Sequence, residues 1–306
     1  MKQMIKYFFL LILAGTFVSC DQDKDNLDAA DDILGLGGDT WAKSDLDKWL
    51  YDSLVKPYNI QVKYKWDQFE FDLSRTLVPP EEAKVIPIWS VLRQAWIQPY
   101  IDEVGATFFN KYAPKTFVLS GSNAYNSNGS ITLGTAEGGR KIALYSCNSF
   151  RVKGMSGYNA ARDSSFIKQF FLQTIHHEFG HILHQNIMYP QSFKQVNPAL
   201  FNGGNWININ DATARRDGFV TSYGSSNYDD DFVEMIAIML IEGKAGFDAL
   251  ISKIPTGTSV NGTTQAQAQA YLRQKEAIVV SYFRQAWNID FYSLQRRCRT
   301  ALERFI

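Results

Sequence analysis

The spacing of hydrophobic residues predicts strands only in the first half of the chain and helices throughout. Alternation with polar residues, as at Ile60, Val62 and Tyr64, is typical of a strand, whereas apolar residues three and four apart are typical of a helix. The elements expected before residue 150 are a helix from Ser44 that Pro57 stops, a strand at 60–64, helical segments over 81–112 interrupted by Pro87 and Pro99, and strands at 116–119 and 142–145.

The second half of the chain is expected to be mainly helical. Phenylalanine, isoleucine and leucine recur at helical spacing over 164–188 and predict a buried helix, which Pro190 ends. The Asn/Gly-rich segment 191–211 lacks periodicity and is interpreted as a loop that forms a wall of the functional site. Further helices are predicted at 231–242, 264–287 and 291–304. A sheet before the central helix and helices after it indicate an α+β fold, in which a small mixed sheet packs on the central helix and a mainly helical part follows.

The first twenty residues are typical of a secretory signal. Lys2 and Lys6 precede an apolar run that ends at Cys20, and this run is shorter than the roughly 20 residues needed to span a bilayer. The segment Phe17-Val18-Ser19-Cys20 resembles a bacterial lipobox, in which the cysteine is lipidated and becomes the mature N-terminus. We therefore expect a signal peptide at 1–20 and a membrane anchor on Cys20.

Residues 21–39 are acidic and glycine-rich and are expected to form a flexible tether. The remainder, 40–306, is long enough for a sizeable core and is predicted to be a single catalytic domain. Without Lys2 and Lys6 the chain has 29 basic and 31 acidic residues, so no basic field attracts nucleic acid. Cys147 and Cys298 could pair, but two buried thiols are the simpler interpretation.

All four histidines lie between His176 and His184, in a stretch that contains the pattern HExxH. In a helix, His177 and His181 stand one turn apart on the same face and can both bind one tetrahedral zinc ion. Glu178 lies beside them and can take a proton from the attacking water. The alternative is a polar helix face, but the absence of histidine elsewhere and the buried flanks favour a metal site.

A catalytic zinc ion usually has three protein ligands, so one more is expected. His184 lies a further turn along the same helix, too far to reach the ion. Metzincins have glycine and histidine where this chain has His184 and Ile187, which excludes that arrangement. We interpret His184 as a residue that supports a ligand or faces solvent, and His176 as structural.

The remaining arrangement takes a glutamate from a later helix, as in gluzincins, and Glu234 is the predicted third ligand. It lies in an otherwise apolar helix, where a buried carboxylate needs a cation; the alternative is a capping box with Asp231. Asp231 could also accept the ring N–H of a ligand histidine, whereas Glu242 is interpreted as exposed. Tyr223 is preferred to Tyr228 as the donor to the oxyanion.

The chain resembles the zinc-binding metallopeptidase lipoproteins of Bacteroidetes, described as substrate import-associated zinc metallohydrolase lipoproteins. The resemblance spans nearly the whole mature chain. The residues that carry it are Cys20, Pro57-Tyr58-Asn59-Ile60, Asn126-Ser127-Asn128-Gly129, Ala136-Glu137-Gly138-Gly139-Arg140, His177 to Gln185, Gly218-Phe219-Val220-Thr221 and Asp231-Phe232-Val233-Glu234. The last stretch is similar to the Phe-Ala-Glu ligand helix of anthrax lethal factor-like peptidases, with Val233 in place of alanine.

This resemblance implies a zincin-like fold, zinc held by His177, His181 and Glu234, Glu178 as the base, and partnership with SusC/SusD-type uptake machinery. We therefore expect an outer-membrane, surface-exposed metallopeptidase that acts on peptides or glycoproteins before uptake. One alternative is an accessory lipoprotein that keeps zinc for structure and binds glycans through tryptophans such as Trp41 or Trp206. Another is a structural partner of the transporter.

Overall fold

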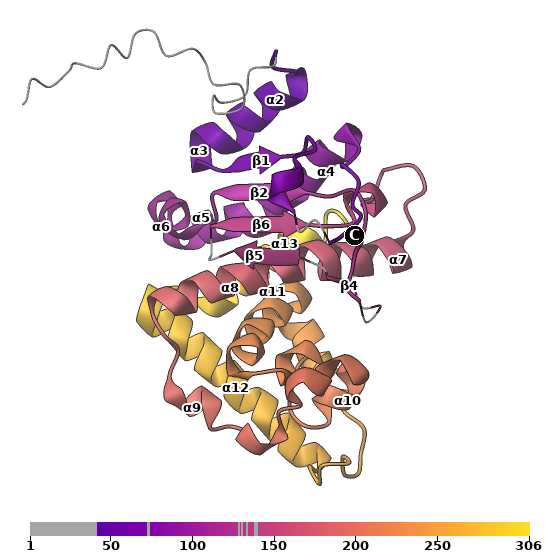
Figure 1. Cartoon of the computed structure of the whole chain (residues 1–306). Coiled ribbons are helices and arrows are strands. Elements are labelled where there is room, and N and C mark those ends of the chain that lie inside the picture. Colours follow the sequence, from indigo (N-terminus) through magenta and orange to yellow (C-terminus); the bar gives the residue numbers. More distant parts are fainter. Residues whose placement is uncertain (1–41, 72–73, 128, 130, 133, 138–139) are drawn as a thin grey trace, which may run out of the picture. The chain divides into compact units, whose positions relative to one another are not determined.

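In the computed structural model, which describes residues 42–306 except 72–73, 128, 130, 133 and 138–139, the strands form two small sheets (Figure 1). The larger sheet consists of β1 (Gln61–Lys63), β2 (Thr116–Leu119), β6 (Lys141–Leu144) and β5 (Gly134–Glu137), in that order, and a hairpin pairs β3 (Ala124–Tyr125) with β4 (Ile131–Thr132). In the larger sheet β1, β2 and β6 are parallel, and β5 is antiparallel to β6. The predicted small mixed sheet is confirmed.

Helices that precede residue 150 cover this sheet with aromatic side chains. Trp89 and Trp96 both contact Phe117 of β2, with ring centroids 4.8 and 5.9 Å apart. Contrary to the prediction, neither Pro87 nor Pro99 interrupts the helical run over 82–104. Pro87 lies in the second turn of this run and Pro99 in the first turn after a π-helical segment, and each removes only one backbone hydrogen-bond donor. The elements are α2 (Asp45–Leu50), η2 (Tyr51–Val55), α3 (Lys56–Tyr58), η3 (Gln68–Glu70), α4 (Glu82–Leu92), η4 (Arg93–Ile97), α5 (Gln98–Val104), α6 (Ala106–Tyr112) and η5 (Cys147–Ser149).

The central helical run lies along the β5 edge of the sheet (Figure 1). It consists of α7 (Ala160–Phe166), the π-helical η6 (Ile167–Gln173) and α8 (Thr174–Asn186). Thr174 at the start of α8 sits so close to Gly134 of β5 that a side chain at Gly134 would collide with it. The sheet therefore packs directly on the helix that carries the histidines, as predicted.

The rest of the chain is helical, and α11 is its centre. This helix begins at Tyr228, three residues earlier than predicted, and Gly243 interrupts it with a φ of 67° and a ψ of 177°. The predicted loop 191–211 contains short helices. The elements are α9 (Gln191–Lys194), η7 (Pro198–Leu200), η8 (Gly203–Asn208), α10 (Asp211–Arg215), η9 (Tyr223–Ser225), α11 (Tyr228–Ser252), α12 (Gln265–Trp287) and α13 (Phe291–Leu302). The fold is α+β, as predicted.

Residues Ser44–Ile306 form one compact unit. The predicted signal peptide 1–20, the lipidated Cys20, the tether 21–39 and Trp41 lie outside the described residues. Within the described part, no helix has the length and hydrophobicity required of a transmembrane span. Cys147 and Cys298 are both buried and form no disulfide with each other.

Candidate metal centre

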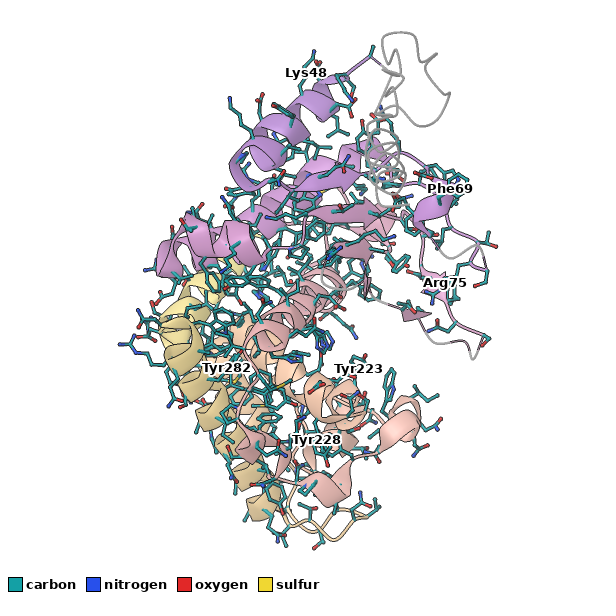
Figure 2. All side chains as sticks on the ribbon, turned by 60° about the vertical axis from the view of Figure 1, so that its left-hand side comes forward. Lys48, Phe69, Arg75, Tyr223, Tyr228 and Tyr282 are labelled. Carbon is teal, nitrogen blue, oxygen red and sulfur yellow. The ribbon has the colours of Figure 1, made fainter. Side chains whose placement is uncertain are left out.

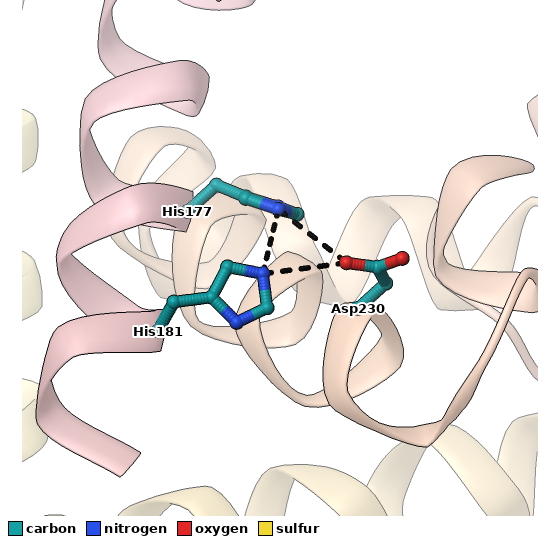
Figure 3. Close-up of side chains that lie close together, drawn as sticks. All are labelled: His177, His181 and Asp230. Carbon is teal, nitrogen blue, oxygen red and sulfur yellow. Dashed lines mark hydrogen bonds and ion pairs between the residues drawn. The ribbon is translucent and has the colours of Figure 1, made fainter. Parts of the chain in front are cut away.

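Two histidine rings of α8 and one carboxylate of α11 converge on the same point (Figure 3). Because His177 and His181 are four residues apart in the helix, their rings stand on one face, with the two Nε2 atoms 3.1 Å apart. Asp230 Oδ1 lies 3.6 Å from His177 Nε2 and 3.3 Å from His181 Nε2. The predicted pair of histidines is therefore joined by an aspartate that the sequence reasoning did not single out.

The spacing of these three atoms fits a zinc ion. Zinc bonds to nitrogen and oxygen are roughly 2.0–2.2 Å long, so neighbouring ligand atoms around a tetrahedral ion lie about 3.3 Å apart. The three distances, 3.1, 3.3 and 3.6 Å, bracket that value. Two imidazoles and one carboxylate are also a donor set that suits zinc, and three protein ligands leave a fourth position open.

Asp230 is held in place by the turn that starts its helix. Its Oδ2 accepts hydrogen bonds from Ser226 Oγ at 2.7 Å and from Asn227 Nδ2 at 2.6 Å, which turns Oδ1 toward the histidines. Asn227 also caps α11, because its Oδ1 accepts from the backbone N–H of Asp229 and Asp230. Burial raises the pKa of Asp230, but its contacts with His181 and Ser226 outweigh burial and lower the pKa, so the carboxylate is ionised.

Glu234 contacts the other side of the His177 ring. Its Oε1 lies 2.8 Å from His177 Nδ1, and its Oε2 accepts hydrogen bonds from Gln173 Nε2 at 2.7 Å and Thr221 Oγ1 at 2.6 Å. These contacts satisfy the buried carboxylate without a cation, contrary to the reasoning that selected it as a ligand. Glu234 holds His177 with Nδ1 protonated and Nε2 free to bind. The role of Glu234 as a metal ligand stays a prediction.

The two remaining histidines differ in role. His184 Nε2 lies 2.8 Å from His181 Nδ1, so it holds the second ring as Glu234 holds the first. Burial lowers the pKa of His184 to about 4, which keeps it neutral and able to accept this hydrogen bond. His176 points away, against Tyr100 with centroids 6.2 Å apart, and burial lowers its pKa to about 3. The support role considered for His184 and the structural role of His176 agree with these placements.

Glu178 and Tyr223 lie beside the converging atoms. Burial raises the pKa of Glu178, although the nearby His177 and His181 oppose that shift. Tyr223 stacks on His177 with centroids 5.5 Å apart and is about one-third exposed, at 37% (Figure 2). Burial and then the charge of Asp230 raise its pKa, so its hydroxyl stays protonated and can donate.

Three other residues considered from the sequence have no part in the convergence. Asp231 forms an ion pair with Lys275, at 2.6 Å, and neither caps α11 nor contacts a histidine. Glu242 was expected to be exposed, but it is partly buried and accepts hydrogen bonds from Lys168 Nζ at 2.9 and 3.0 Å. Trp206 packs on Tyr223 with centroids 4.8 Å apart, which places part of the segment 191–211 beside the site.

Asp230, Gln173 and Thr221 were missed from the sequence, although spacing carried a signal for two of them. Asp230 precedes Glu234 by four residues and Gln173 precedes His177 by four, so each shares a helix face with a predicted site residue. Thr221 reaches Glu234 from a non-helical segment, and no periodicity in the sequence indicates that contact.

The α+β fold, the helical HExxH pair and the carboxylate from a later helix define a zinc metallopeptidase-like protein. The sequence family described as "Putative zinc-binding metallo-peptidase" matches residues 39–292, and the chain belongs to this family. A solved structure of a protein with the same description, from Bacteroides caccae, is similar with a TM-score of 0.64 and 26% identity. The similarity covers 86% of this chain and 95% of that one. No curated protein matches the chain.

Proposed function

We propose that this protein is a zinc-dependent hydrolase that cleaves amide bonds in peptides or glycoproteins. The observation that carries the proposal is the convergence of His177 Nε2, His181 Nε2 and Asp230 Oδ1 at spacings of 3.1–3.6 Å, next to Glu178. Membership in a zinc-binding metallopeptidase family supports it independently. We assign the three ligand atoms to these residues, and Asp230 takes the position that the gluzincin-like scheme gave to Glu234.

Each neighbouring residue then has a chemical task. Bound zinc supplies a Lewis acid that polarises a carbonyl and lowers the pKa of water. Glu178, whose pKa burial raises, accepts the proton of the attacking water and passes it to the leaving amine. Tyr223 stays protonated beside His177, and its hydroxyl donates a hydrogen bond to the oxyanion that forms during amide hydrolysis.

We further propose that the protein acts at the cell surface as an outer-membrane lipoprotein anchored through Cys20, in association with SusC/SusD-type uptake machinery. The lipobox-like segment that ends at Cys20 supports the anchor. The acidic residues behind it resemble the surface-export signals of Bacteroidetes lipoproteins, which supports a position at the cell surface. The partnership is supported by the resemblance to import-associated lipoproteins. The substrates of the anchored hydrolase would then be polymers that it cleaves before the transporter imports the fragments.

Replacing Glu178 with Gln tests the enzyme directly. The variant should keep one zinc ion per chain, measured by metal analysis, and lose turnover by about 10²–10⁴-fold, because the proton acceptor is gone. Turnover is measured with a mixed peptide and glycopeptide library, with and without a chelator. Glu242→Gln makes the same chemical change at a carboxylate paired with Lys168 and should leave turnover unchanged.

A Glu178→Gln variant that cleaves as fast as the parent would overturn the mechanism. If neither protein cleaves anything in the library while both bind the same glycans, the accessory binding lipoprotein becomes the better description. That alternative has less support, because the ring of Trp206 already packs against Tyr223 and does not stand alone as a surface for a sugar ring.

A further inference from the structure

A lysine is buried behind the metal centre. The side chain of Lys275, on α12, has no solvent exposure, and its Nζ lies 2.6 Å from Asp231 Oδ2. The same Nζ donates a hydrogen bond to the carbonyl oxygen of Gly218 at 2.9 Å and lies 4.2 Å from the centroid of the Phe219 ring. The ammonium group of Lys275 therefore links two segments to α12: the start of α11 and the segment that contains Gly218 and Phe219.

A buried ion pair such as Lys275–Asp231 is not expected to stabilise the fold more than apolar residues would. The side chains of Lys275 and Asp231 are 0% and 1% exposed, so both charges lose their hydration on folding. The attraction between two buried charges often does no more than offset that loss. Apolar residues of similar size often stabilise such a position equally well or better. A role other than stability is therefore the better explanation.

The two segments that Lys275 joins both lead to the metal centre. Asp231 follows the proposed ligand Asp230 directly and precedes Glu234 by three residues. Gly218 precedes Thr221 by three residues, and Thr221 donates to Glu234. The ammonium group thus connects the start of α11 to the segment that holds Glu234 from outside the helix.

Gly218 makes a second contact with the same face of α12. Its φ is +81°, and a Cβ there would lie 2.7 Å from the Cβ of Tyr271, so only glycine allows this approach. Tyr271 and Lys275 are four residues apart and therefore adjacent on the helix. Two successive turns of α12 fix the position of one peptide unit.

We propose that Lys275 is a positioning residue for the zinc site: with Asp231 and the carbonyl of Gly218 it fixes α11 and the Gly218–Thr221 segment relative to each other. Asp230 then lies at the correct distance from both histidines. Thr221 likewise holds Glu234 where it contacts the ring of His177. This inference rests on the proposed zinc site and adds a residue from a helix that contributes no ligand.

The test is the double variant Lys275→Met/Asp231→Leu in the full chain, which removes one positive and one negative charge and leaves the net charge unchanged. It should remain folded, because apolar side chains of similar volume fill the space. Its zinc dissociation constant should rise about tenfold or more, as when a residue that orients a metal ligand is lost. The visible spectrum of the cobalt(II)-substituted protein should change, because it reports the arrangement of the ligands.

Two comparisons make the result decisive. The single variant Lys275→Met leaves Asp231 buried and unpaired and should be much less stable than the double variant, as measured by its Tm. Arg273→Gln/Asp248→Asn removes an exposed ion pair between the same two helices and should change neither zinc affinity nor the cobalt spectrum.

A folded double variant with the parent's zinc affinity and cobalt spectrum would overturn the positioning role, whatever its Tm, and so would a double variant that unfolds as readily as the single one. The proposed function fails separately: Asp230→Ala with the parent's zinc affinity would reject the ligand set, whatever Lys275 does.

Discussion

The part of the protein before α8 and the part after it contact that helix with different chemistry. The first part supplies aromatic rings: Trp96 and Tyr100 pack on Phe179 with centroids 5.8 and 4.9 Å apart. The later part supplies polar groups, among them Asp230 and Glu234, which reach the histidines. Packing thus fixes one face of α8, and hydrogen bonds and charges set the chemistry of the other.

This comparison suggests that stability and metal binding can be changed separately. Side chains on the face of α8 that packs against η4 and α5 should affect the free energy of unfolding, whereas those on the α11 side should affect zinc affinity. The following predictions test that separation, beginning with the change expected to have the largest effect.

Asp230→Ala should abolish tight zinc binding. The loss of one of three ligand atoms should raise the zinc dissociation constant by far more than the roughly 10–100-fold expected when Glu234→Gln weakens the support of His177. Both constants can be measured by competition with a chromophoric chelator. A larger loss for Glu234→Gln than for Asp230→Ala would instead support Glu234 as the ligand, as the sequence predicted.

Phe179→Ala should destabilise the fold while leaving zinc stoichiometry intact. The ring is fully buried among aromatic neighbours, and such a truncation costs about 3–5 kcal/mol of unfolding free energy. Denaturant titration gives the stability, and metal analysis of the folded fraction gives the zinc content. Folded protein without zinc would contradict the division between the two faces of α8.

His184→Ala should weaken zinc binding about tenfold, because His181 loses the acceptor that orients its ring. His176→Phe is the matched control: this histidine is also buried in α8, but it faces Tyr100. The control should change Tm rather than zinc affinity. Equal zinc affinities for parent and His184→Ala would show that His181 needs no support.

Asp47→Asn, in the first part of the chain, should lower stability by about 1 kcal/mol at neutral pH, the usual worth of a helix cap. Burial raises the pKa of Asp47, but hydrogen bonds from Ser44, Tyr64 and Lys65 outweigh it and lower the pKa well below its ordinary value. Its contribution is therefore present above about pH 4, the unfolded pKa, and disappears as the pH falls through the folded pKa.

Thermal unfolding of Asp47→Asn and the parent at several pH values checks this prediction. The difference in Tm should shrink in acid, whereas zinc affinity at neutral pH should be the same in both proteins. An undiminished difference at acidic pH would mean that the carboxylate charge does not provide the stability.

The elements that periodicity predicts well are those with one apolar face. The metal helix, the strands near Val62, Phe117 and Ile142, and the C-terminal helices were all expected close to where they lie. The boundary of α11 was missed because Asn227, whose side chain caps the helix, precedes three consecutive aspartates that offered competing start signals. Once the start is placed at Tyr228, Asp230 falls within the first turn.

The histidine pair could be predicted because both residues belong to one helix with a fixed repeat. The third convergent residue depends on how two helices cross, which is set by packing between positions as far apart in the sequence as His181 and Asp230. The reasoning that a buried carboxylate needs a cation selected Glu234, but neutral donors on Gln173 and Thr221 can satisfy it equally well. Sequence spacing alone does not distinguish these two solutions.

Gly180 has a consequence for ion selectivity. It lies between the two histidines that face Asp230, and a Cβ there would stand 3.0 Å from Val233 Cγ1 of α11. The absence of a side chain therefore determines how near the backbone of one helix comes to the other. We therefore expect the proposed site to bind a wider ion such as cadmium less tightly than zinc, because the wider ion would need the two helices further apart.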